Sequence, residues 1–549
     1  MLSRCLKFAA LALAVCGFAA PARAADEPSV LVRVQSVNDL LKTAEFVGSL
    51  VPEDQREQVK QMVDFAKSVI DEKKGLEGID VKNPIGLYAS LNADNPTTSP
   101  VVGLIPVADK DTLLNALKER VKLEIKEKDG LYETTVPDAQ MAVYFRFANN
   151  YAYVSNQPES IDPKGLPKPA DVLGQSDKTV TATVRIDRLP EQAKKMAIGF
   201  LEAQLAQGKD APVPNETKAI KAFKDQAIDD LTRTLQSVLM DGEKLSLHLN
   251  ADPKTEEFAL ELELTGKSGS KLAKDLKSIS ENKSVVAGAI GSADAAMAIN
   301  VSVALAPDLK KLFGPVVDDV LELAKKEANV PGEFQTKAEP LLKALTPSLK
   351  AGDLDAGLAL HGPDKDDRYT VVFGLKLAEG KKVEDAIRTL VTKELPPEIG
   401  GVIKVDAEDL TGGAKLHVIQ VGQHLDEKMA KVFGKSDAYL SFRDDLLVLA
   451  FGPQGKEAVT KAVASKPADV GVVQFKMQAG RIAAIAGDTA DELAAAKAAV
   501  KKVFGDKPPT KDGVVFAITG GDSLKIKIGI QSKAIQFLAE TSTVQKKDN

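Results

Sequence analysis

Cysteine, tryptophan and histidine are all scarce in this chain of 549 residues. Its two cysteines, Cys5 and Cys16, lie near the N-terminus, so disulfides, thiolate metal sites and cysteine nucleophiles are not expected beyond that segment. There is no Trp, and aromatic residues make up 5% of the chain, which disfavours a carbohydrate platform built from exposed rings. Any imidazole base or metal ligand must come from four histidines.

Those histidines are His248, His361, His417 and His424. None has a further ligand nearby in sequence at the spacing a metal site needs, and His ligands normally occur in clusters. We therefore expect all four to be surface residues, with His248 and His361 beside turns at strand ends. No metal and no cofactor is predicted.

Motifs of catalysis and nucleotide binding are missing too. The chain has no G-x-S-x-G elbow, no phosphate loop and no dinucleotide fingerprint. The acidic run from Asp364 to Arg368 lacks the central Gly and the final Glu of an EF-hand loop, so it predicts an acidic hairpin turn. No catalytic residue is predicted, and we expect the protein not to be an enzyme.

The first 24 residues have the three parts of a secretory signal: a basic start, an apolar run and a small-x-small cleavage site that ends at Ala24. The apolar run is shorter than the roughly 20 residues that cross a bilayer, and no later segment predicts a membrane span. We expect a mature chain that begins at Ala25 and is periplasmic or secreted. The alternative is a lipid anchor through Cys16.

Acidic residues outnumber basic ones, 78 to 72. Loss of the three basic residues of the leader would move the formal charge from -6 to -9. No cluster of Lys and Arg is evident, and phosphate backbones need a basic patch. Nucleic acid is therefore not an expected partner.

The strongest positive signal is a repeat, in which the order of elements in residues 29–280 recurs in residues 295–540. A strand, turn, strand and helix follow Leu245 in LSLHLNADPKTEEFALELELTGKSGSKLAKDL, and the same unit follows Gly357 in GLALHGPDKDDRYTVVFGLKLAEGKKVEDAI. Looser copies begin at Gly86 and Gly513. The predicted domains are a signal peptide at 1–24, a first repeat domain at 25–281, a linker or packed crossover at 282–292, a second repeat domain at 293–541 and a tail at 542–549.

Consecutive strand pairs with helices between the groups predict an α+β fold, internally duplicated, with mainly antiparallel sheets and helices packed on one face. In the strand that begins at Leu245, every second residue is Leu, while Ser246 and His248 point the other way. We expect helices to cover the apolar sheet face and the polar face to be solvated in each half.

A partner is expected on these polar faces. The candidate binding residues are Lys244, His248, Glu261, Glu263, His361, Lys376, Lys525 and Lys527. The alternative is a solvated face with no function, the default for antiparallel sheets. Because acidic Glu261 and Glu263 stand where the other half has Lys525 and Lys527, we do not expect both halves to bind one ligand identically. A further hypothesis is that these faces meet, within one chain or between chains.

In general composition, the chain is similar to uncharacterised exported bacterial proteins, being rich in Ala, Lys and Leu and repeated internally. This resemblance implies no residue role and no activity. We expect an exported non-enzymatic binding or scaffolding protein of the cell envelope, whose partner is an unknown protein or envelope component. Two alternatives stay open: a carrier of an apolar ligand such as a lipid, held between helices and sheet, and a cell-envelope hydrolase whose residues converge only in three dimensions.

Overall fold

The computed structural model describes residues 28–50, 53–68, 70–71, 75–91, 99–136, 141–214, 216–281, 283–327, 332–485, 490–505 and 509–545. The signal peptide predicted for residues 1–24, with the alternative anchor at Cys16, lies outside the described residues. Of the tail predicted for residues 542–549, the last four residues also lie outside them, and residues 542–545 belong to helix α18 (Ser532–Gln545).

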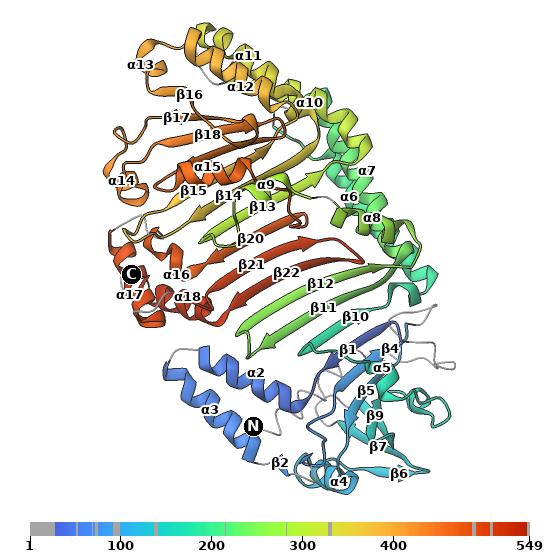
Figure 1. Cartoon of the computed structure of the whole chain (residues 1–549). Helices are drawn as coiled ribbons and strands as arrows, with labels where there is room; N and C mark the ends of the chain where they lie inside the picture. Colours follow the sequence, from blue (N-terminus) through green and yellow to red (C-terminus); the bar gives the residue numbers. More distant parts are fainter. Residues whose placement is uncertain are drawn as a thin grey trace. The chain divides into compact units, whose positions relative to one another are not determined.

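The described chain forms two compact units (Figure 1). Unit 1 comprises residues 28–200 and 236–273, and unit 2 comprises residues 201–235 and 274–545. Helices α6 (Glu191–Asp210), α7 (Lys218–Asp241) and α8 (Lys271–Glu281) each contain a boundary between the units.

Unit 1 contains short helices and ten strands of one sheet among the described residues, together with a separate β2–β3 pair. Its elements are β1 (Val30–Val34), α2 (Val37–Leu50), α3 (Glu53–Ser68), β2 (Ile70–Asp71), β3 (Gly75–Leu76), β4 (Ile85–Ala89), β5 (Val101–Pro106), α4 (Lys110–Glu119), β6 (Lys126–Lys128), β7 (Leu131–Val136), β8 (Met141–Ala148), β9 (Tyr151–Ser155), α5 (Pro169–Leu173), β10 (Val180–Val184), β11 (Gly242–Asp252) and β12 (Glu257–Gly266). All neighbouring strands of the sheet are antiparallel, in the order β12-β11-β10-β1-β4-β5-β9-β8-β7-β6.

Unit 2 has the same plan. Its elements are α9 (Val285–Ala289), β13 (Met297–Ala304), α10 (Pro307–Glu327), α11 (Gly332–Lys350), β14 (Asp353–His361), β15 (Thr370–Lys376), α12 (Gly380–Thr389), α13 (Pro397–Gly400), β16 (Ile403–Asp409), β17 (Lys415–Ile419), α14 (Glu427–Phe433), β18 (Ala438–Arg443), β19 (Leu446–Phe451), α15 (Gly455–Val463), β20 (Val473–Gln478), α16 (Ala479–Ile482), α17 (Ala490–Phe504), β21 (Gly513–Thr519), β22 (Ser523–Gln531) and α18. Its antiparallel strands follow the order β22-β21-β20-β13-β14-β15-β19-β18-β17-β16.

The two strand orders correspond strand for strand. In each unit the first strands of two hairpin modules pair with each other, β1 with β10 and β13 with β20. This matching strand order is what the predicted repeat requires. That the two halves arose by duplication stays a prediction. The α+β class and the antiparallel pairing predicted from the sequence are confirmed.

Helix α9 lies within the segment predicted as a linker or packed crossover. The Ser284 hydroxyl accepts a hydrogen bond from the Ala287 amide at 2.8 Å and donates to the buried Asp355 carboxylate at 2.6 Å. Asp355 also accepts from the Val285 amide at 2.8 Å, so a carboxylate caps the positive end of this helix. The segment packs within unit 2, where Val286 is buried in the core.

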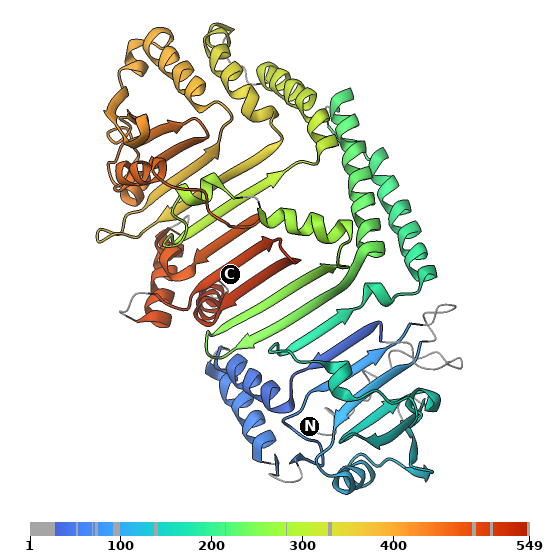
Figure 2. The same cartoon turned by 45° about the vertical axis from the view of Figure 1, so that its right-hand side comes forward.

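Small side chains on the unit 2 sheet allow α9 and α15 to lie across one of its faces (Figure 1, Figure 2). A Cβ atom at Gly374 would lie 2.7 Å from the Val286 side chain, and one at Gly357 would lie 2.9 Å from Ile290. Only glycine permits this approach. The resulting core consists of Val286, Ala289, Ile290, Ala295, Ala298, Ala359, Val372, Leu416, Leu446, Val448, Ala450, Val459 and Ala462.

Among the described residues, no helix combines the length and the apolar composition needed to cross a lipid bilayer.

Candidate functional site

The other face of the unit 2 sheet carries its large aliphatic and aromatic side chains. Residues paired directly across antiparallel strands point to the same side, so the strand register identifies this face. We call it the unit 2 aliphatic face, and it consists of Met297, Ile299, Val301, Val303, Leu354, Ala356, Leu358, Leu360, Val371, Phe373, Leu375, Val473, Phe475, Met477, Val514, Phe516, Ile518, Ile526, Ile528 and Ile530. No side chain of this set is polar.

Most of the unit 2 aliphatic face is only partly buried. Leu354 is 51% exposed, Ile528 is 49% exposed and Ile299 is 41% exposed, whereas Val372 on the opposite face is 1% exposed. Burying a side chain of this size contributes about 1.5–3 kcal/mol relative to leaving it in water. The face therefore lacks the hydrophobic stabilisation that a buried core would gain. Exposed apolar patches of this kind are typical of surfaces that bind another molecule.

In the described part of unit 2, the helices packed against the aliphatic face lie at its margins. At one margin, Leu341 and Leu345 of α11 pack beside Leu375 and Leu447, next to a buried cluster around Phe442. At other strand ends, α14 and α16 contact the region of Met297 and Val371, and α17 and α18 contact Val514 and Ile530. The most exposed side chains of the face lie outside these clusters.

Unit 1 repeats this arrangement on a five-stranded part of its sheet. The unit 1 aliphatic face consists of Ile85, Leu87, Ala89, Val30, Val32, Val34, Val180, Ala182, Val184, Leu245, Leu247, Leu249, Ala251, Phe258, Leu260, Leu262 and Leu264. Helix α2 covers one corner, where Phe46 stacks on Phe258 with ring centroids 4.7 Å apart. Leu247, Leu249 and Leu260 are each more than two-fifths exposed.

The prediction that helices cover the apolar face and leave the polar face solvated is wrong for the centres of both sheets. In unit 1 the polar side chains Thr181, Thr183 and Ser246 are less than one-tenth exposed, while Leu249, on the other side of the sheet, is 46% exposed. The Thr183 and Ser246 hydroxyls are hydrogen-bonded to each other at 2.9 Å. Because these groups satisfy one another across neighbouring strands, they do not need water.

The structure brings three of the predicted binding residues of unit 1 together. His248 Nδ1 lies 3.2 Å from the Thr181 hydroxyl, and its Nε2 lies 3.4 Å from a carboxylate oxygen of Glu263. Glu261 lies directly opposite His248 in the strand register. Lys244 is on the same face but further along β11, opposite Thr265. These contacts form a cross-strand polar network.

The predicted binding residues of unit 2 are dispersed. His361 ends β14, and its Nε2 donates to the Ile290 carbonyl at 2.8 Å. Lys376 is exposed at the far end of β15. Lys525 and Lys527 lie on β22, on the side opposite the aliphatic face. The structure therefore does not bring these four side chains into one site.

A buried ionic network around His417 was not predicted from the sequence. The expectation that His417 lies at the surface is wrong, because it is 2% exposed. Its Nε2 lies 3.1 Å from the Glu384 carboxylate, and its Nδ1 accepts the Asp406 amide N–H at 3.2 Å. Arg388 bridges the acids, with bonds of 2.9 and 2.8 Å to Asp406 and 3.4 Å to Glu384.

Glu384, Asp406 and His417 also have atoms close enough together to suggest a metal site. Both His417 nitrogens are already in hydrogen bonds, however, and the Arg388 guanidinium supplies the positive charge that a cation would bring. This hydrogen bonding with Arg388 holds the pKa of Asp406 below its ordinary value. The arrangement fits a neutral His417 that donates from Nε2, within a structural ion-pair network.

Comparison with known proteins gives no relative: no protein-family model, no curated protein and no solved structure matches the chain.

Proposed function

We propose that this protein is an exported carrier that binds the acyl chains of a lipid on its aliphatic faces. The observation that carries the proposal is the placement of large apolar side chains on partly exposed sheet faces while small and hydroxyl side chains are buried on the other side. An apolar ligand would remove this surface from water and gain the hydrophobic free energy that the protein alone forgoes.

Acyl chains suit these faces better than a peptide does. A peptide needs hydrogen-bond partners for its backbone, either from a free strand edge or from polar side chains. Within the aliphatic faces, the strands are paired on both sides from β10 to β4 in unit 1 and from β20 to β15 in unit 2. No polar side chain points from either face, so an occupant without hydrogen-bonding groups is favoured.

The alternative of a binding or scaffolding protein for another protein rests on large exposed apolar patches, which also mark protein interfaces. A hydrolase is less well supported, because the buried histidine of unit 2 has both nitrogens in hydrogen bonds. The experiment below separates the lipid carrier from the protein-binding alternative.

We would purify the full chain from its native envelope and identify bound molecules by lipid extraction and mass spectrometry. Wild type should carry lipid, and the double variant Leu354→Asp/Ile528→Asp should lose most of it, because two carboxylates on the face would have to be desolvated by an acyl chain. Met429→Asp is the matched control, since Met429 is 39% exposed on α14 and lies outside the face.

Retention of the same lipid by all three proteins would refute the proposal. A stoichiometric protein partner that is lost from Leu354→Asp/Ile528→Asp, with no lipid on wild type, would favour the binding alternative.

A further inference from the structure

Unit 1 buries a cation whose Nε and Nη1 groups have no hydrogen-bond partner among the described residues. Arg33 of β1 is 6% exposed, and its Nε and Nη1 groups make no hydrogen bond within the structure. A guanidinium carries five N–H donors and stays charged in proteins. Burial lowers the pKa of Arg33, and nearby Tyr151 and Asp39 oppose this only in part. An unpaired buried charge costs several kcal/mol, so its retention calls for an explanation.

The carboxylate that acts on the pKa of Arg33, that of Asp39, already has other hydrogen-bond partners. Asp39 accepts hydrogen bonds from the Ser36 hydroxyl at 2.6 Å and from Lys42 Nζ at 2.9 Å. It contributes charge at a distance but does not hydrogen-bond the guanidinium. The described part of the chain therefore places no carboxylate in hydrogen-bond contact with Nε or Nη1 of Arg33.

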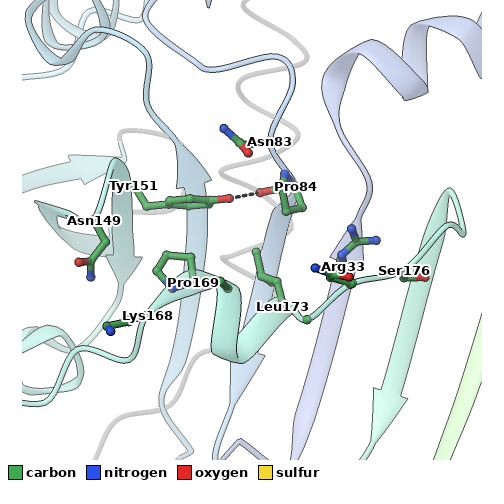
Figure 3. Close-up of a pocket in the computed structure, with 12 residues that line it drawn as sticks. Arg33, Asn83, Pro84, Asn149, Tyr151, Lys168, Pro169, Leu173 and Ser176 are labelled. Carbon is green, nitrogen blue, oxygen red and sulfur yellow. Dashed lines mark hydrogen bonds between the residues drawn. The ribbon is translucent and has the colours of Figure 1, made fainter.

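Arg33 lines a cavity of about 530 Å³ within unit 1. Figure 3 shows its guanidinium beside Leu173 and Ser176, at the end of the cavity away from Lys168 and Asn149. None of the described residues that line the cavity is acidic. Its apolar wall includes Leu173 and the ring of Tyr151, whose hydroxyl donates to the Pro84 carbonyl at 3.0 Å.

Polar groups near Arg33 can supplement its charge. The Ser176 hydroxyl oxygen accepts the Lys178 amide at 3.1 Å, which leaves its proton to donate. Lys168 places a second positive charge at the exposed end of the cavity. Two cations, a hydroxyl and an apolar wall suit a small anion with an apolar part, bound through its oxygens.

Unit 2 provides an internal comparison. Arg33 lies opposite Gly86 and Thr181, and the position with the matching register in unit 2 is Asn300, opposite Gly357 and Gln474. Asn300 is 1% exposed, and its side-chain oxygen and nitrogen also find no hydrogen-bond partner among the residues that the structure describes. Only unit 1 has a charged residue there, so only unit 1 is suited to an anion.

We propose that the Arg33 cavity binds an oxyanion, a carboxylate or phosphate group, through the guanidinium. The site lies on the opposite side of the sheet from the unit 1 aliphatic face, and the proposal does not depend on lipid binding there. The buried guanidinium forms the ion pair with the negatively charged oxygens of the ligand.

The test uses thermal unfolding of the full chain at fixed ionic strength, with inorganic phosphate or butyrate exchanged for chloride. Wild type should gain about 3 °C in Tm at a concentration near ten times Kd. Arg33→Met should show no response. Without ligand it should be at least as stable as wild type, because an apolar side chain replaces an unpaired charge. Lys164→Met is the matched control, since Lys164 is exposed and lies four residues before Lys168 in the sequence but does not line the cavity, and it should respond like wild type.

Arg33→Asn, which introduces the residue found at the matching position of unit 2, replaces Arg33→Met in the experiment if that variant does not fold. Its Tm should also not change when phosphate or butyrate is added. A response to phosphate alone or to butyrate alone identifies the group that the site prefers, and either supports the proposal. The proposal is overturned if wild type responds to neither probe, or if the Arg33 variants respond as wild type does.

Discussion

A matched pair of valines tests whether the unit 2 aliphatic face is a packed core or an open surface. Val303 lies on that face and is 38% exposed, whereas Val372 lies on the opposite face and is 1% exposed. Both are in strands of the same sheet. We predict that Val303→Asn destabilises unit 2 far less than Val372→Asn does.

The magnitudes follow from burial. Loss of a fully buried Val side chain costs about 1.5 kcal/mol, and a buried amide with no hydrogen-bond partner adds about 1–3 kcal/mol. Val372→Asn should therefore cost about 3–4 kcal/mol. At Val303 only part of the side chain leaves an apolar environment, and the new amide can be hydrated, so the cost should be about 1 kcal/mol.

Urea denaturation of the full-length variants, followed by far-UV circular dichroism, measures both costs; the chain has no Trp to report by fluorescence. Equal destabilisation by the two substitutions would mean that the aliphatic face is buried as tightly as the core beneath α9, and that it is not an open surface. Shifts in the transition midpoint at constant slope give the cleanest comparison.

Three further predictions concern other parts of the molecule. The pKa of Asp406 lies below its ordinary value of 3.8 because Arg388 hydrogen-bonds the carboxylate. The stability that this carboxylate contributes is therefore present above pH 3.8 and is lost as the pH falls through the lowered pKa. In an acid titration followed by circular dichroism, Asp406→Asn should lose less stability than wild type. Gly380→Ala should lower Tm by an amount equivalent to about 1–3 kcal/mol, because the new Cβ would lie 1.9 Å from the Arg443 carbonyl oxygen; an unchanged Tm in calorimetry would contradict this. If acidic and basic sheet faces meet as the sequence hypothesis holds, Lys525→Glu with Lys527→Glu should change the hydrodynamic radius or oligomeric state, and unchanged light scattering would remove the hypothesis.

The alternation of residues was enough to predict which side chains share a sheet face. It placed Leu245, Leu247 and Leu249 together, and the strand register confirms this. Local periodicity is sufficient for such features because each depends on neighbouring residues only.

Which face the helices cover could not be read from that alternation. The answer depends on small residues such as Gly357 and Gly374, which lie far from α9 in sequence yet let it approach the sheet. A period-two pattern says that a face is apolar, and it does not say what lies against it.

The buried polar groups were missed for a similar reason. His417 meets Glu384 from another element 33 residues away, and the unpaired state of Arg33 is a property of the folded environment. A lone Arg in a Val-rich strand, Val30–Val34, was the one local signal of an unusual buried charge.

Photo-crosslinking from within the unit 2 aliphatic face is the most direct test of the proposed lipid binding. Phe516, partly exposed on β21, would be replaced by the photoreactive analogue benzoyl-phenylalanine, with Met429 on α14 as the control position. After irradiation in the native envelope, intact-mass analysis should find a lipid-sized addition at position 516 and none at position 429. Equal additions at both positions, or a crosslinked protein in place of lipid at position 516, would contradict the proposed lipid binding.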